Sequence, residues 1–128
     1  MKQASPYLIV ANVKDSLSYY HAVFGGEIKI LQEHAGKILH AELHLGDSIL
    51  HFSDSYGREP EAKQAKIMLQ CDSEQEIRSI YEALKKEGEV TVELQDTFFG
   101  ALHGQVTDKL NGIGWVLNFF KAQPNQDN

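Results

Sequence analysis

Residues 66–94 read KIMLQCDSEQEIRSIYEALKKEGEVTVEL, and this stretch decides the fold. It begins with a short apolar run that is typical of a buried strand. Ser73 and Glu76 have the spacing of a capping box, which marks the start of a helix. Apolar residues then recur at helical spacing as far as Gly88, which ends the helix, and an alternating strand follows. The stretch therefore predicts a strand, a helix and a second strand in that order.

Residues 6–31 predict the same succession of elements. A β-rich run leads to Asn12, the expected N-cap of a helix whose apolar stripe continues to a pair of glycines. Corresponding positions lie at a nearly constant offset, which is 61 residues from Asn12 to Ser73 and 62 residues from Gly26 to Gly88. Because this offset is close to half of the chain, we expect one module that occurs twice rather than a repeat array.

Each half contains two further expected strands. In the first half, residues 38–47 alternate between apolar and polar side chains and lead through a Gly-Asp turn into residues 48–54. In the second half, residues 101–108 and 113–120 take the same places. We therefore expect an α+β fold built from two βαβββ modules. The expected boundaries are about 6–55 for module one, about 56–65 for an exposed linker, about 66–121 for module two and 122–128 for a frayed tail, all within a single domain over residues 1–128.

Composition and charge narrow the classes of function. The chain has 42% hydrophobic and 23% charged residues, which is typical of a globular protein. Its formal net charge of −6 argues against a nucleic-acid partner, because such a partner requires clustered Lys and Arg. No apolar run reaches the roughly 18 to 20 residues that span a membrane, and the N-terminal residues do not resemble a secretory signal. The single cysteine, Cys71, excludes an internal disulfide, and we expect a buried packing role for it in a cytoplasmic protein.

Strand alternation places several histidines opposite the apolar faces of the expected sheets. His40, Glu42 and His44 share one face of their strand, His51 lies on the polar face of the next strand, and His103 takes a similar place in module two. If the sheets curl, these faces line a cavity. Imidazole and carboxylate groups are common metal ligands, so a metal site is one interpretation. A merely polar side of a half-exposed sheet is the other interpretation.

The stretch ELQDTFFGALHG at residues 93–104 predicts a loop at the rim of such a cavity. The loop begins at Gln95, and the side chains of Gln95 and Thr97 offer hydrogen bonds to a ligand. We expect one of Phe98 and Phe99 to face the cavity while the other packs on the core, because adjacent side chains diverge. Burial of both rings in the core is the alternative.

The chain resembles the vicinal oxygen chelate superfamily, which includes glyoxalase I, bleomycin resistance proteins and extradiol dioxygenases, and within it the PhnB-like branch. The resemblance rests on PYLIVAN, SYYHAVFGGE, ILHAELHLGDSILHFSD, LQDTFFGALHG and VTDKLNGIGWVLN, which are spread from Pro6 to Asn118. It implies paired modules that form an open, mostly antiparallel, barrel-like sheet with a cavity. It also implies a homodimer and, commonly, a divalent metal held by one residue from each of four strands.

The four implied metal positions fall near Ser5 or Tyr7, on His51, near Lys66 and near Val116 or Asn118. Only His51 is a good ligand, and the ammonium group of Lys66 repels a metal ion. A divalent metal at His51 is therefore the one cofactor candidate. Relatives more often read DTFWGxRYG where this chain has DTFFGALHG, so Leu102 stands in place of an arginine and an anion anchor is missing.

We expect the protein to bind a small polar metabolite in a concave cavity, with metal-assisted lyase or isomerase chemistry as one option. The alternative is a non-catalytic protein that sequesters a drug or metabolite, as bleomycin resistance proteins do, and the sequence leaves open whether the chain is an enzyme. Expected partners are the ligand and a second copy of the chain, with no nucleic acid and no membrane. The candidate ligand-binding residues are His40, Glu42, His44, His51, Gln95, Thr97, Phe98, Phe99, His103 and Asn118.

Overall fold

The computed structural model describes residues 1–121, and the tail expected at 122–128 lies outside the described residues. The first half contains β1 (Tyr7–Val10), α1 (Val13–Phe24), β2 (Glu27–His34), β3 (Lys37–Leu45) and β4 (Ser48–Asp54). The second half contains β5 (Lys66–Gln70), α2 (Glu74–Lys85), β6 (Glu89–Asp96), β7 (Ala101–Thr107) and β8 (Gly114–Phe120). The chain divides into two compact units, and the boundary between them in the sequence lies between Lys63 and Gln64.

Each unit is a four-stranded sheet with the same topology. The strand order is β1-β4-β3-β2 in the first sheet and β5-β8-β7-β6 in the second. The first strand of each unit pairs in parallel with the last strand, and the other pairs are antiparallel. The α+β fold with two βαβββ modules is confirmed, and the sheets do not close into a barrel.

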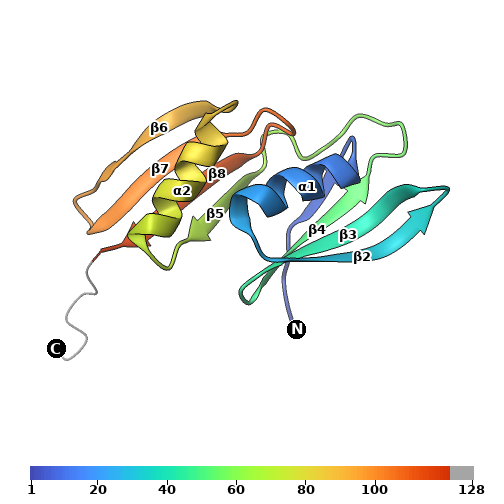
Figure 1. Ribbon diagram of the computed structural model, residues 1–128, viewed down its shortest axis with the longest axis horizontal. Coiled ribbons are helices and arrows are strands. Elements are labelled where there is room, and N and C mark those ends of the chain that lie inside the picture. Colours follow the sequence, from blue (N-terminus) through green and yellow to red (C-terminus); the bar gives the residue numbers. More distant parts are fainter. Residues whose placement is uncertain (122–128) are drawn as a thin grey trace. The chain divides into compact units, whose positions relative to one another are not determined.

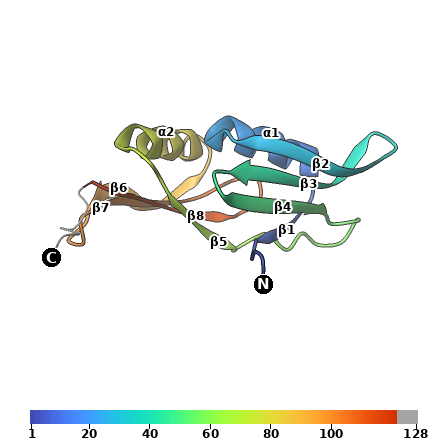
Figure 2. The same cartoon turned by 90° about the horizontal axis from the view of Figure 1, so that it is seen from below.

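One helix covers one face of each sheet (Figure 1, Figure 2). The buried face of α1 includes Leu17 and Tyr20, and Tyr20 stacks on Phe52 of β4 with ring centroids 5.7 Å apart. In the second unit, Trp115 and Leu117 of β8 are completely buried. Burial of such a side chain contributes about 1.5–3 kcal/mol, so these helix-facing residues fix which face of each sheet stays open.

Both helices begin at the predicted N-cap residues. Asn12 caps α1, because its Oδ1 accepts a hydrogen bond from the backbone N–H of Asp15 at 2.9 Å. Ser73 caps α2 in the same way through the N–H of Glu76. The carboxylate of Glu76 reaches back to the N–H of Asp72 at 2.7 Å, so the capping box closes one residue earlier than the simple motif predicts.

Gly88 has a different role from the one predicted for it. Helix α2 already ends at Lys85, and Lys86 keeps a right-handed helical conformation. A Cβ atom on Gly88 would lie 2.6 Å from the carbonyl oxygen of Thr107. Glycine is therefore required because the chain passes close to β7, and not because a left-handed residue ends the helix.

The connecting segment at 56–65 contains no helix or strand and is mostly exposed, with one exception. Ala62 is only 2% exposed, and its backbone N–H donates to the carbonyl oxygen of Ile9 at 3.0 Å. This contact ties the end of the segment to β1. In the described part of the chain, residues 1–121, no helix is both long and apolar enough to cross a membrane.

Candidate functional site

Glu42 is the centre of a polar cluster on the sheet face of module one that lies opposite α1. Its neighbours Ala41 and Leu43 are buried, whereas the Glu42 side chain is 14% exposed on the other face. The Oε1 atom lies 2.7 Å from Nε2 of His44, two residues along β3. The Oε2 atom lies 3.7 Å from Nδ1 of His51, because His51 is the Cα partner of Glu42 on β4. The carboxylate is thus held between two imidazoles.

The hydrogen bond from His44 lowers the pKa of the Glu42 carboxyl, which burial opposes and the charges of His51, His44 and Lys29 reinforce. Glu42 is therefore a carboxylate at neutral pH. Both side chains that contact it come from rigid strands, so the cluster presents an oriented acceptor flanked by imidazole groups. Such an arrangement accepts hydrogen bonds from hydroxyl or ammonium groups of a ligand.

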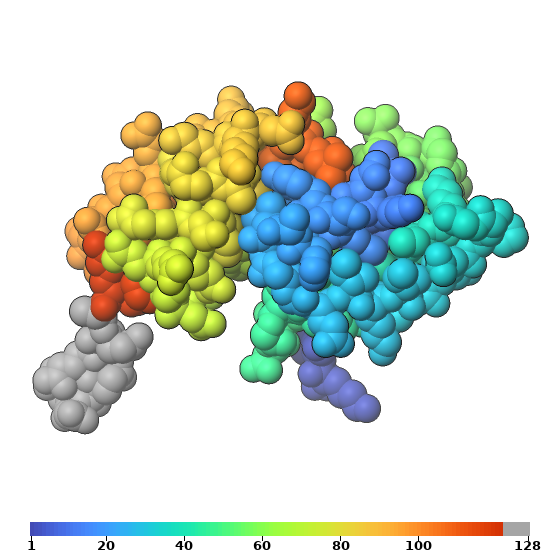
Figure 3. All heavy atoms as spheres, viewed as in Figure 1, coloured from blue at the N-terminus to red at the C-terminus, as the bar shows by residue number. Residues whose placement is uncertain are grey.

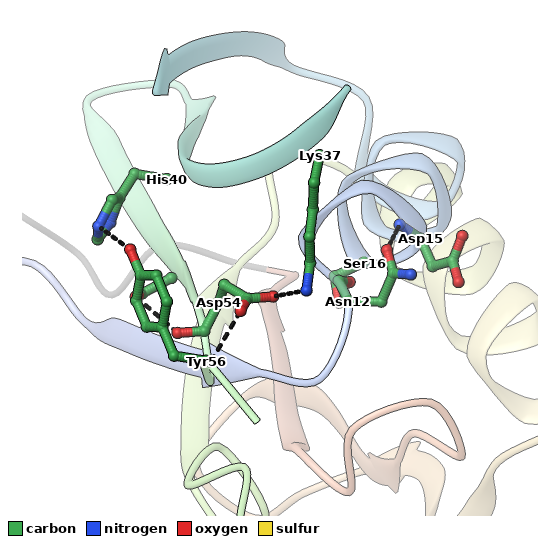
Figure 4. A network of polar contacts seen from close by, with 8 residues as sticks. Asn12, Asp15, Ser16, Lys37, His40, Asp54 and Tyr56 are labelled. Atoms are coloured by element: carbon green, nitrogen blue, oxygen red, sulfur yellow. Dashed lines mark hydrogen bonds and ion pairs between the residues drawn. The ribbon is translucent and has the colours of Figure 1, made fainter. Parts of the chain in front are cut away.

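His40 lies on the same face of β3 but belongs to a second network (Figure 4). Its Nε2 atom lies 3.3 Å from the Tyr56 hydroxyl. Tyr56 has a left-handed backbone, with a φ of 54°, and its N–H donates to Oδ2 of the buried Asp54 at 2.7 Å. Lys37 Nζ lies 3.3 Å from the other Asp54 oxygen, at ion-pair distance but without hydrogen-bond alignment. Asp54 therefore fixes the turn that brings Tyr56 over His40.

In module two, His103 joins two amide side chains on the open face of the sheet. Its Nδ1 atom lies 2.7 Å from Oδ1 of Asn118 on β8. Its Nε2 atom lies 3.2 Å from Nε2 of Gln105, two residues along β7. Asn118 is only 6% exposed, and His103 and Gln105 are half-buried. His103 and Asn118, two of the candidate ligand-binding residues, thus contact each other on this face.

The stretch predicted as a rim loop is shorter than expected. Gln95 is not in the loop, because it belongs to β6 and pairs with His103 on β7. Thr97 begins the turn, but its hydroxyl donates to the carbonyl oxygen of Ala101 at 2.8 Å and accepts the N–H of Ala101 at 3.2 Å. The Thr97 side chain therefore closes the turn, and its predicted role as a hydrogen-bonding group for a ligand has no support in the geometry.

Neither aromatic residue of the turn is in the core. Phe98 is fully exposed and Phe99 is 48% exposed, so the alternative that buries both rings is wrong. The expectation that one ring packs on the core is wrong as well, because the Phe99 side chain is also exposed. Its centroid lies 6.3 Å from that of His103 and 6.4 Å from that of Phe120. Phe99 is thus adjacent to the His103 cluster.

Cys71 is unsuited to nucleophilic catalysis. Burial, together with the charges of Glu76 and Asp72, raises the pKa of its thiol to about 12. At neutral pH the sulfur is protonated, whereas a nucleophilic cysteine requires the thiolate. His21 and His34, which lie outside both clusters, are exposed on the surface.

Comparison with known proteins fits this architecture. The sequence profile of the glyoxalase/bleomycin resistance protein/dioxygenase superfamily matches residues 2–117. The chain belongs to this superfamily. Protein YjdN of Escherichia coli (strain K12), which is 30% identical over 146 residues, aligns with 95% of this chain and 98% of its own length.

Solved structures of the same fold cover nearly the whole chain. Protein PA1353 from Pseudomonas aeruginosa is 31% identical, with a TM-score of 0.78 over 93% of this chain and 98% of that one. A Bacillus cereus protein described as a putative 3-demethylubiquinone-9 3-methyltransferase, PhnB protein, has a TM-score of 0.73 at 20% identity, over 92% of this chain and 99% of that one. The second likeness shows a shared fold alone.

The metal positions implied by the superfamily do not form a metal site here. Tyr7 is the partner of His51 across β1 and β4 but carries a phenol, and Lys66 is an exposed cation opposite Gly114. His51 is the one imidazole among these positions, and it lies beside Glu42. Within residues 1–121, no three His, Cys, Asp or Glu side chains are arranged to hold a metal ion. Ligation of a metal by His51 stays a prediction that metal analysis can test.

Several residues that shape the two clusters were not identified from the sequence. Gln105 could have been found, because it alternates in phase with His103 along β7. Asp54 and Asp108 are almost completely buried, yet strand alternation alone does not indicate which carboxylates are buried. Asp108 accepts hydrogen bonds from the Trp115 indole at 2.8 Å and from the N–H of Asn111 at 2.7 Å. It thereby fixes the turn that leads into β8.

Proposed function

We propose that the protein binds a small polar metabolite on the open faces of its sheets, with Glu42 as the anchor in module one. The carboxylate held between His44 and His51 is the observation that carries this proposal. Oε1 of Glu42 is hydrogen-bonded to His44, whereas Oε2 lies 3.7 Å from Nδ1 of His51, beyond hydrogen-bond distance, so Oε2 can accept a ligand hydroxyl or ammonium group. His40, which lies on the same face of β3 and contacts the Tyr56 hydroxyl at 3.3 Å, offers a further polar group.

A ligand that binds only the folded state raises the melting temperature by mass action. We expect some members of a panel of polyols, amino acids and amino sugars to raise the Tm of the wild-type protein. The same compounds should have a smaller effect on Glu42→Gln, which keeps the side-chain shape but removes the charge. If every compound leaves the wild-type Tm unchanged, the proposal is wrong.

Binding is common to an enzyme and to a sequestering protein, and product analysis separates them. A metal-assisted lyase or isomerase should contain stoichiometric metal when it is purified without chelators or a His-tag, and His51→Ala should lose that metal. A sequestering protein should return its ligand chemically unchanged.

We also propose a homodimer in the cytoplasm. The support for a dimer is β2, an edge strand in which every residue is exposed and whose atoms lie at the surface of module one (Figure 3). Ile28, Ile30 and Leu31 of β2 are 37%, 48% and 49% exposed. Open edge strands with apolar side chains are usually covered by a partner.

The absence of any cysteine besides Cys71 supports a reducing compartment. Light scattering and cell fractionation test these two statements.

A further inference from the structure

The His103 cluster of module two has a property that follows from the chemistry of a neutral imidazole. A neutral ring has one N–H donor and one nitrogen acceptor. As placed, Nδ1–H donates to Oδ1 of Asn118, and Nε2 accepts from the Nε2 group of Gln105. Each ring nitrogen thus contacts one amide side chain, and each amide must offer the complementary atom to the ring.

The two amides must therefore present opposite groups away from the ring. Asn118 gives its oxygen to His103 and keeps an N–H₂ group, whereas Gln105 gives its nitrogen and keeps an oxygen. If the ring adopts the other tautomer and both amides flip, Gln105 keeps the N–H₂ group and Asn118 keeps the oxygen. One donor and one acceptor remain in either case. Among the described residues, the structure shows no other side-chain hydrogen bond for these two amides.

This pair of groups is oriented before any ligand arrives. Asn118 is 6% exposed, so its rotation is restricted by packing. Gln105 and Asn118 are held by the same imidazole on neighbouring strands, β7 and β8. The charge of Asp96, which follows Gln95 on the adjacent strand, is paired with Lys121 at 2.7 Å. The two amides that contact His103 thus offer one neutral donor and one neutral acceptor.

Apolar surface lies on both sides of the cluster. Phe99 is 48% exposed and lies 6.3 Å from His103, in contact with Phe120 at 6.4 Å. Met68, the partner of Val116 across β5 and β8, is 57% exposed. An aromatic side chain beside hydrogen-bonding groups favours a flat ring, because the ring face packs while its edge bonds.

We propose that His103, Asn118 and Gln105 form a binding site for the amide edge of a neutral, planar ring, in the form of a lactam or a ring carboxamide. The carbonyl of the ligand accepts from the outward N–H₂ group, its N–H donates to the outward oxygen, and the ring packs against Phe99. His103 is a positioning residue, because it acts through the two amides. This inference rests on the proposed function, since it names the ligand chemistry that the module-two part of the polar surface accepts.

Benzamide and benzoate provide a matched pair of probes, because they have the same ring and nearly the same shape but differ in charge and in the N–H donor. A fragment of this size binds weakly, so titrations at millimolar concentration monitored by ¹H–¹⁵N NMR are suitable. We expect benzamide to shift the side-chain N–H₂ signals of Asn118 and Gln105. Benzoate should bind about tenfold more weakly, because it has no donor for the outward oxygen.

Three variants test which atoms are responsible. Gln105→Leu removes one outward group and should weaken benzamide binding about threefold to tenfold. His103→Phe keeps an aromatic ring but releases both amides, so it should reduce the preference for benzamide over benzoate as well as the affinity. Gln75→Leu, at an exposed position of α2, is the control and should bind benzamide as the wild type does. Fluorescence of Trp115, which is the single tryptophan, reports whether each variant is folded.

The outcomes separate this inference from the proposed function. The inference is overturned if benzamide and benzoate shift the same signals equally, or if folded Gln105→Leu and His103→Phe bind benzamide with wild-type affinity and preference. In that case a Tm increase that depends on Glu42 would leave the proposed function standing. Conversely, benzamide binding that is unchanged in Glu42→Gln would support the module-two site when no polar metabolite binds module one.

Discussion

Replacement of Asp108 by asparagine is expected to destabilise module two strongly although the side chain keeps its size. Asp108 is 2% exposed, and its Oδ2 atom accepts the Trp115 indole N–H at 2.8 Å. Its Oδ1 atom accepts the backbone N–H groups of Asn111 and Gly112 at 2.7 and 3.2 Å. Asparagine can retain the oxygen toward the backbone, but its N–H₂ group then faces the indole donor.

The magnitude follows from these contacts. A buried donor that loses its acceptor costs about 1–3 kcal/mol, and the two backbone hydrogen bonds also lose their charge assistance. We therefore expect the free energy of unfolding to fall by about 2–4 kcal/mol, which is a large part of the 5–15 kcal/mol that is usual for a domain. Urea denaturation monitored by the fluorescence of Trp115, the hydrogen-bond partner of Asp108, measures this change in the free energy of unfolding. Asp47→Asn, at the exposed β3–β4 turn, is the matched control. A loss below about 0.5 kcal/mol for Asp108→Asn, the range of an ordinary surface substitution, would refute the reasoning.

Three further outcomes are expected. Thr97→Val should lower the free energy of unfolding by about 1–2 kcal/mol, because it removes both hydroxyl contacts with Ala101, whereas Thr97→Ser should retain most of the stability in urea denaturation. The partly buried Cys71, with its thiol pKa raised to about 12, should react slowly with iodoacetamide near neutral pH and faster as the pH rises, and rapid labelling of the folded protein at neutral pH would contradict the raised pKa. The pKa of Glu42 in the folded state is lowered from 4.5, so the Glu42 carboxylate should stabilise the fold above pH 4.5. This stabilisation should be lost as the pH falls through the pKa of the folded state. In urea denaturation, the free energy of unfolding should therefore depend less on acidic pH for Glu42→Gln than for the wild type.

The module architecture was predictable because it depends on features that are local in the sequence. Asn12 and Ser73 cap helices through residues three positions away, and strand alternation alone assigns His40, Glu42 and His44 to one face. Helix caps and strand alternation each involve residues only a few positions apart, so both can be recognised in the sequence. The offset of about 61–62 residues between the halves then indicated the duplication.

The contacts within the site were less predictable, because they depend on register and rotamer. His51 meets Glu42 only through the β3–β4 register, and Asn118 meets His103 only through the β7–β8 register. Thr97 was expected to face a ligand, but a threonine at the start of a tight turn finds its nearest partners in the backbone of that turn. The prediction for Phe98 and Phe99 was wrong for a related reason. The two residues lie in a turn, where side chains do not alternate between two faces as they do in a strand, and both rings are exposed.

The central claim is that Glu42 anchors a polar ligand, and one affinity comparison tests it most directly. The panel compound that raises the wild-type Tm most should be titrated calorimetrically into the wild type, Glu42→Gln and the control Glu82→Gln, whose side chain is exposed on α2. A hydrogen bond to a charged group contributes about 1.5–3 kcal/mol, so Glu42→Gln should bind about tenfold to a hundredfold more weakly, while the control should match the wild type. Equal affinity of the wild type and Glu42→Gln would contradict the account.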